Sequence, residues 1–368
     1  MNNCKQLIKN FALAVLAVPA MYSCSDWTDV EAVDYHYTLP SEQDPEAYNA
    51  YLALLKEYKQ NPHKILIAKF DNSKYEVSGQ ADRLSALPDS TDFIVLQAAD
   101  SLNPVIEQEM KEVREQKGTR TLYALDYADV EAQLQAILDK EEAEATESDG
   151  ETESPAPEEG TGQTEGTEQT ETPAPDRFIE VCTHYADSLL ALYDKYGYDG
   201  ILAVYNNIAY PGSMTEEEKA QLQARQDAFF GKIRNWAESH PDAPFLFEGK
   251  PENLVDTSIL SHADYIIIPG YDAGNINEVL WNAEMSLAEG VPSDRIVFGV
   301  AIPSLTDEKA TDGYFNGTEY AVIETASNIA SDEGSFVKAG LCVKNVRDDY
   351  FNPEHTYTHI RQAIQIMN

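Results

Sequence analysis

The sequence predicts an α/β fold in which eight strand–helix units close into a TIM barrel. Short apolar runs typical of buried strands alternate with helix-like segments, which is the pattern of a parallel sheet. Polar residues follow most of these runs, as expected at the functional end of barrel strands. Eight units fit between residues 63 and 368, the count and size of a barrel. An open doubly wound sheet is the alternative, but it seldom needs eight regular units.

The predicted strands are apolar runs at residues 64–70, 93–96, 121–125, 201–205, 244–247, 265–268, 296–301 and 340–343. Apolar residues at helical spacing predict helices at residues 104–117, 129–144, 178–196, 215–239, 276–289 and 356–367. The helix at 178–196 ends at Gly197, and glycine is the residue type that usually follows a helix end.

The first 24 residues predict an export signal. Lys5 and Lys9 precede an apolar core at 11–20, which is too short to span a membrane. The stretch 21–24, Met-Tyr-Ser-Cys, resembles a bacterial lipobox, in which cleavage leaves the cysteine as a lipidated N-terminus. We therefore expect a lipid anchor at Cys24 and a place in the cell envelope, at the outer membrane. The alternative is an ordinary cleaved signal with an incidental cysteine.

Residues 25–62 predict a tether and an N-terminal helix ahead of the barrel, which covers residues 63–368. Segment 141–176 interrupts the barrel and is rich in Glu, Thr, Gly, Ser and Pro, without Lys, Arg or aromatic residues. Such a composition buries too little apolar surface to offset the entropy of ordering, so we expect a disordered acidic insertion. Because the insertion follows a predicted helix, we expect it on the N-terminal side of the barrel, away from a ligand.

Charge and cysteine content exclude several classes of function. The net charge of −38 argues against nucleic-acid binding and against electrostatic attraction to anionic lipid. Seven scattered histidines give no metal site, no nucleotide-binding motif occurs, and we predict no cofactor. Only Cys182 and Cys342 would remain after lipidation of Cys24, and we expect two buried free thiols there.

One motif connects the barrel to a known family. The stretch Tyr198–Asn207 resembles the signature strand of glycoside hydrolase family 18, D-G-x-D-x-D-x-E. Asp199 and Gly200 match its opening pair. The three later acidic positions fall on other residue types, namely Leu202, Val204 and Asn206.

The resemblance covers roughly Lys64 to Asn368 and is closest to the exported endo-β-N-acetylglucosaminidase branch, which acts on N-glycans. It implies substrate-assisted hydrolysis, in which an Asp orients the N-acetyl group of the substrate and a Glu protonates the leaving oxygen. Asn206 stands at the position of that acid, and an amide has no proton of suitable pKa to donate. Val204 stands at the position of the orienting Asp. The resemblance also implies that Tyr271, after the sixth strand, contacts the N-acetyl group.

The predicted strand ends carry amides, carboxylates and tyrosines, a mixture that suits a sugar. Each of these residues could instead cap a helix or satisfy a turn. The predicted ligand-binding residues are Asp71, Gln97, Asp126, Tyr127, Tyr205, Asn206, Glu248, Tyr271 and Asp272. Other polar residues after strands are Asn72, Asn207, Asn345 and Asp349. We predict no catalytic residue, and Glu248 and Asp272 are the candidates for a substitute acid.

The sequence thus predicts a lipid-anchored pseudoenzyme that binds N-acetylglucosamine-containing oligosaccharides, N-glycan or chitin-like, within a glycan-utilisation system. A divergent endo-β-N-acetylglucosaminidase that uses Glu248 or Asp272 is the alternative. A third hypothesis is a structural partner of an envelope glycan-uptake complex. Sugar binding without products would support the first hypothesis, and hydrolysis would support the second. The absence of both would support the third.

Overall fold

The computed structural model describes residues 40–148, 176–206, 210–306, 311–331 and 333–368. Two compact units divide the chain, at residues 1–50 and 51–368. In the first unit, the described residues form helix α2 (Pro40–Gln43) and the beginning of helix α3 (Pro45–Gln60). None of the helices within these described ranges is both long and apolar enough to cross a membrane.

The described residues of the second unit contain a closed barrel of eight parallel strands, in the order β1-β10-β7-β6-β5-β4-β3-β2. Each predicted strand overlaps one of these, so the predicted TIM barrel is confirmed. The strands are β1 (Ile65–Phe70), β2 (Phe93–Leu96), β3 (Arg120–Asp126), β4 (Gly200–Tyr205), β5 (Phe245–Gly249), β6 (Tyr265–Pro269), β7 (Ile296–Ala301) and β10 (Lys338–Lys344).

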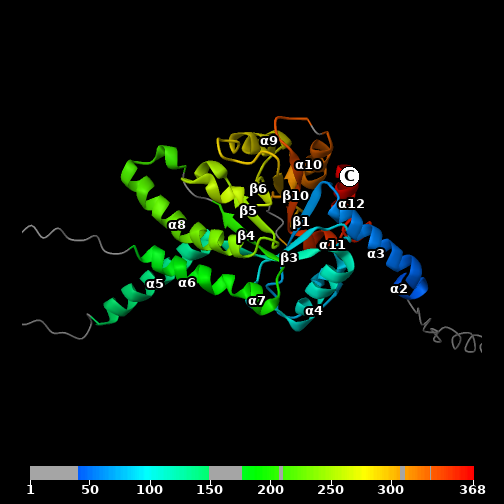
Figure 1. Ribbon diagram of the computed structural model, residues 1–368, viewed down its shortest axis with the longest axis horizontal. Helices are drawn as coiled ribbons and strands as arrows, with labels where there is room; N and C mark the ends of the chain where they lie inside the picture. Colours follow the sequence, from blue (N-terminus) through cyan, green and yellow to red (C-terminus); the bar gives the residue numbers. More distant parts are fainter. Residues whose placement is uncertain (1–39, 149–175, 207–209, 307–310, 332) are drawn as a thin grey trace, which may run out of the picture. The chain divides into compact units, whose positions relative to one another are not determined.

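Helices surround the strands in Figure 1. The predicted helix at 178–196 divides at Ala191, and the segment after β7 adds a hairpin and a helix that the sequence pattern did not indicate. The elements are α4 (Pro104–Glu112), α5 (Tyr127–Ser148), α6 (Arg177–Leu190), α7 (Leu192–Tyr196), α8 (Glu216–Ser239), α9 (Ile276–Met285), β8 (Tyr314–Phe315), β9 (Glu319–Tyr320), α10 (Ala321–Ala330), α11 (Val346–Tyr350) and α12 (Thr358–Met367).

Successive strand residues face two separate apolar layers. The layer inside the barrel is made by alternate residues of the strands, and the other strand residues pack against the helices. Burial on both faces explains why the strands read as continuous apolar runs. Cys182 and Cys342 are free and buried, as predicted. The inner layer consists of Ile65, Ile67, Val95, Leu122, Leu202, Val204, Leu246, Ile267, Val297, Ala339 and Cys342.

Helices α5 and α6 precede and follow residues 149–175 in the sequence. Helix α5 begins directly after β3, at the C-terminal end of the barrel, and runs beside α6 (Figure 1). Tyr185 of α6 accepts a hydrogen bond from the backbone N–H of Asp126 at the end of β3. Arg177, farther out on α6, makes two hydrogen bonds to Glu141 of α5. Both helices therefore extend from the C-terminal side of the barrel, and the predicted N-terminal placement of the insertion falls on residues 149–175, outside the described residues.

The predicted insertion begins too early in the sequence, compared with the observed end of helix α5. Residues 141–148 continue helix α5 to Ser148, and α6 starts at Arg177. Glu and Ala are good helix formers, which explains why the helix continues through Glu-Glu-Ala-Glu-Ala at 141–145. The prediction of disorder for the rest of the segment falls on 149–175, outside the described residues.

Candidate functional site

The C-terminal mouth of the barrel is lined by residues that continue the inward alternation of the strands. On β1, Ile65 and Ile67 face inward, and Lys69 is the next residue on that face. By the same alternation, Asp126 of β3 and Glu248 of β5 face inward, and so does Asn206, the residue directly after β4. These four polar side chains thus form the innermost polar layer of the mouth.

Lys69 and Glu248 form an ion pair across the barrel. Strands β1 and β5 stand opposite each other in the closed strand order. The Nζ atom of Lys69 lies 2.8 Å from Oε1 and 2.6 Å from Oε2 of Glu248. The side chains are 16% and 1% exposed, respectively. This buried pair closes the barrel interior just below the mouth.

Asn206 is held by the same carboxylate. Its Nδ2 donates a hydrogen bond of 3.1 Å to Oε1 of Glu248. Its Oδ1 is buried and has no hydrogen-bond partner among the described residues. A buried acceptor without a partner is costly, so this oxygen would gain from a new donor. Hydroxyl and acetamido N–H groups of a sugar are such donors.

Asp126 is the titratable group of the mouth. Burial raises the pKa of Asp126 to about 6, although the hydrogen bond from the backbone N–H of Ala128 opposes that shift. The neighbouring charges of Asp129 and Glu248 add to the increase, and Lys69 reduces it. A carboxyl group with this pKa exchanges its proton within the range of pH used by general acids.

The pKa of Asp126 predicts a pH-dependent stability. Its ordinary pKa is 3.8, so between pH 4 and 6 the folded chain retains a proton that the unfolded chain has released. Rising pH in this window therefore lowers the free energy of unfolding. We expect Asp126→Asn to be more stable than the natural chain at pH 7 by about 1–2 kcal/mol, after allowance for partial exposure. The two proteins should converge near pH 3, and urea unfolding between pH 3 and 8 measures the difference.

Tyr271 follows β6, but its hydroxyl points into the barrel. The oxygen lies 3.6 Å from Sγ of Cys342, and the ring sits so close to Gly299 that a Cβ there would be 2.9 Å from the ring. The Nζ atoms of Lys69 and Lys344 lie 5.2 and 5.9 Å from the ring centroid. Tyr271 therefore belongs to the mouth, with its hydroxyl engaged inside the barrel.

The retained half of the signature motif has a structural role. Asp199 pairs with Arg114 and accepts a hydrogen bond from the backbone N–H of Thr121, at the N-terminal end of the barrel. A Cβ on Gly200 would lie 2.1 Å from the carbonyl oxygen of Pro244, so only glycine fits there. Leu202 and Val204 fill the barrel interior. The two residues that match the motif, Asp199 and Gly200, thus support the barrel.

Two predicted ligand-binding residues face the helices instead of the mouth. Tyr127 and Tyr205 are buried, with ring centroids 4.9 Å apart. The hydroxyl of Tyr205 accepts a hydrogen bond from Gln226 of α8. Because Val204 faces inward, the adjacent Tyr205 must face outward. We therefore correct the prediction and remove both tyrosines from the candidate site.

The other predicted residues differ in what they contact. Asp71 is exposed and caps a turn through Ser73, while the exposed side chains of Gln97 and Asp272 make no hydrogen bond or ion pair among the described residues. Asn72 and Asp349 are buried in structural hydrogen bonds, the first to Ala98. Asn345 donates to the carbonyl of Ile302, and Asn207 lies outside the described residues.

Sequence reasoning missed Lys69, which organises the site. The signal was present, because a lysine at the inward-facing position after Ile67 interrupts an otherwise apolar strand. Within the described residues, no group of three or more His, Cys, Asp or Glu side chains could hold a metal ion.

Comparisons with known proteins agree with this architecture. A model of the family described as glycoside hydrolase family 18, BT1044-like, matches residues 28–366. A solved structure of a selenomethionine form of BT1044 superposes with a TM-score of 0.59 at 18% identity, covering 90% of this chain and 96% of that one. No curated protein sequence matched the chain.

Two further structures share the fold. The apo endo-β-N-acetylglucosaminidase from Cordyceps militaris gives a TM-score of 0.56 at 15% identity, covering 87% of this chain and 96% of that one. A family-18 chitinase from Pseudoalteromonas aurantia gives 0.51 at 14% identity, covering 82% and 99%. At such identities the likeness supports the fold alone.

Proposed function

The chain belongs to the BT1044-like group of glycoside hydrolase family 18, and from this premise we propose that it binds glycans without hydrolysing them. The ligands would be N-acetylglucosamine-containing oligosaccharides of the N-glycan or chitin type. Relatives of this fold include an endo-β-N-acetylglucosaminidase and a chitinase, whose substrates fit this class. The proposed binding face is the C-terminal mouth of the barrel.

The observation that supports loss of chemistry is the contact between Asn206 and Glu248. Asn206 occupies the position of the family's general acid, and loss of such an acid typically costs about 10²–10⁴-fold in rate. Glu248 cannot easily replace the acid, because Lys69 contacts both of its oxygens and Asn206 donates to one of them. Val204, at the position of the orienting Asp, lies in the apolar inner layer.

The test combines binding and product analysis on the same protein. We would titrate a panel of N-glycans and chitooligosaccharides by calorimetry and analyse each mixture for cleaved products by mass spectrometry. We expect heat of binding and no products beyond those in protein-free controls. Cleavage of any panel member at a rate proportional to protein concentration would contradict the proposal.

Asn206→Ala identifies the binding face. Loss of one hydrogen bond to a sugar should weaken affinity by roughly 3–10-fold. Asn277→Ala is the matched control, since Asn277 is exposed on α9 and its side chain makes no hydrogen bond within the described residues. Equal affinities of the two variants would remove Asn206 from the site.

A second candidate function is residual hydrolysis, and Asp126 favours it. With its pKa raised to about 6, this carboxyl could donate a proton at mildly acidic pH. Asp272, the other predicted substitute, is exposed and lacks such an environment. If products form in the assay above, Asp126→Asn should abolish them, whereas Asp272→Asn should not.

We further propose that the protein is anchored in the cell envelope through a lipid on Cys24, at the outer membrane. Support comes from the export-signal pattern and the lipobox-like stretch ending at that cysteine. Oligosaccharides and neighbouring glycan-uptake proteins are its proposed partners. Incorporation of labelled palmitate at Cys24 is the measurement that tests the anchor, and a cleaved N-terminus elsewhere would contradict it.

A further inference from the structure

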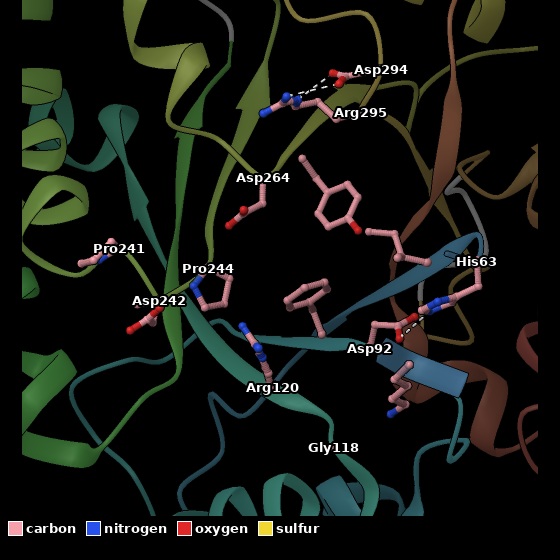
Figure 2. A pocket seen from close by; sticks show the side chains of 15 residues that line it. His63, Asp92, Gly118, Arg120, Pro241, Asp242, Pro244, Asp264, Asp294 and Arg295 are labelled. Carbon is pink, nitrogen blue, oxygen red and sulfur yellow. Dashed lines mark hydrogen bonds and ion pairs between the residues drawn. The ribbon is translucent and has the colours of Figure 1, made fainter. Parts of the chain in front are cut away.

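A pocket of about 470 Å³ lies at the opposite end of the barrel from the mouth (Figure 2). Its walls come from residues that open the strands, including Phe93 of β2, Arg120 of β3 and Tyr265 of β6. Pockets of roughly 300–1,000 Å³ are the usual size for small ligands. The mouth described above shares none of these residues, so this pocket is a separate feature of the N-terminal face.

The floor of the pocket is aromatic. Phe93 and Tyr265 are half-buried, with ring centroids 5.9 Å apart and planes inclined at 65°. Both rings pack against the inner apolar layer and close the lower end of the barrel interior. Their remaining exposed faces look into the pocket, where an aromatic face can cover the apolar C–H surface of a sugar ring.

Charged groups surround this floor, and most of them are already paired. His63 and Asp92 lie 2.9 Å apart, and Arg295 pairs with Asp294 at 2.8 Å, as the dashed lines in Figure 2 show. Lys59 donates to the carbonyl of Thr91 and to the hydroxyl of Thr119. Because these groups are already engaged with one another or with the backbone, they line the walls but offer little attraction to an ion.

Three further charged residues of the walls, Arg120, Asp242 and Asp264, have polar atoms available to a ligand. The exposed guanidinium of Arg120 makes no hydrogen bond or ion pair within the described residues. One oxygen of Asp264 accepts from the backbone N–H of Phe245, and the positive charges of Arg120 and Arg295 act on the same carboxylate. Its other oxygen and the carboxylate of Asp242 make no hydrogen bond or ion pair in the same part of the chain. Figure 2 shows the three residues around the pocket opening. The opening thus offers five N–H donors and at least two free carboxylate acceptors.

We propose that this pocket is a second carbohydrate site, which takes one or two neutral sugar rings on the N-terminal face. A sugar hydroxyl donates and accepts at the same time, so vicinal hydroxyls can serve Arg120 and Asp264 together. An anion would gain Arg120 alone and would meet four aspartates, at Asp92, Asp242, Asp264 and Asp294. The hydrogen bond to Asp92 raises the pKa of His63, which helps to balance the charge of the walls without favouring an ion.

The experiment counts the sites on the intact protein. Calorimetry with N,N′-diacetylchitobiose should give two bound disaccharides per chain, and glucuronic acid should not compete at the N-terminal site. Arg120→Met should weaken one of the two sites at least tenfold, because a charge-assisted donor is lost. Tyr265→Leu should affect the same site. Arg361→Met is the matched control, since it removes an exposed arginine on α12, away from the pocket.

The outcomes separate this site from the mouth. If Asn206→Ala weakens one site and Arg120→Met the other, both sites exist. If Asn206→Ala removes all binding and neither Arg120→Met nor Tyr265→Leu changes the isotherm, the second site is refuted and the proposed site at the mouth stands. If Arg120→Met removes all binding, the N-terminal site stands and the proposed mouth fails. Tighter binding of glucuronic acid than of the disaccharide, lost in Arg120→Met, would overturn the neutral-sugar assignment.

Discussion

Lys69→Met is expected to lower the free energy of unfolding by about 3–5 kcal/mol, the range for removing one partner of a buried ion pair. The variant leaves the carboxylate of Glu248, which is 1% exposed, without a cation and with only the amide of Asn206 and the hydroxyl of Tyr271 as hydrogen-bonding neighbours among the described residues. A charge left in the apolar interior must be neutralised or hydrated, and either costs stability. Methionine keeps the length of the lysine stem, so loss of packing contributes little.

A double-mutant cycle isolates the pair from other effects. Glu248→Gln alone should destabilise the chain by a similar amount, since it leaves the ammonium of Lys69 unpaired. The double variant Lys69→Met/Glu248→Gln should recover much of the loss, because neither charge is then buried alone. Urea unfolding of the four proteins at pH 7 gives the coupling energy. Two single variants that each cost less than about 1 kcal/mol would mean that the pair is hydrated like a surface pair.

The strand pattern of the barrel could be predicted from sequence because each strand is buried on both faces. Ile201–Tyr205 reads as a continuous apolar run for this reason, and the structure assigns Gly200–Tyr205 to β4. The helix after β7 was not predicted because its segment follows an irregular stretch with a short hairpin. Local apolar patterns therefore predicted the barrel strands, but they did not predict the elements within the long connection after β7.

The site was harder to predict because polar residues at strand ends were selected without asking whether each side chain points into the barrel or toward the helices. Tyr205 and Asn206 are neighbours, yet one packs against α8 and the other reaches Glu248. Counting the alternation from the inner apolar residues would have separated them. The pairing of Lys69 with Glu248 joins residues 179 positions apart and depends on strands facing each other across the barrel. Sequence spacing carries no information on that contact.

Gly200→Ala is expected to be among the most damaging substitutions in the chain, with a loss of about 3 kcal/mol or more in the free energy of unfolding. The added Cβ would lie 2.1 Å from the carbonyl oxygen of Pro244 and 2.9 Å from its Cγ. The same carbonyl accepts a hydrogen bond from the backbone N–H of Ile201, which helps to join β4 to β5. The clash is therefore with backbone that cannot move without opening the barrel.

Gly231→Ala on α8 is the matched control, because its added Cβ would meet no other heavy atom of the described residues within 4 Å, apart from its chain neighbours and the nearby backbone of its own helix. Alanine in a helix is favoured over glycine by about 1 kcal/mol, so this variant should be neutral or more stable. Thermal unfolding and expression of the two variants compare the sites directly. A tolerated Gly200→Ala would undo the argument that the glycine is kept for packing. A severe loss would support a structural role for Gly200, in which the glycine is kept because the strand it opens packs against the backbone of Pro244.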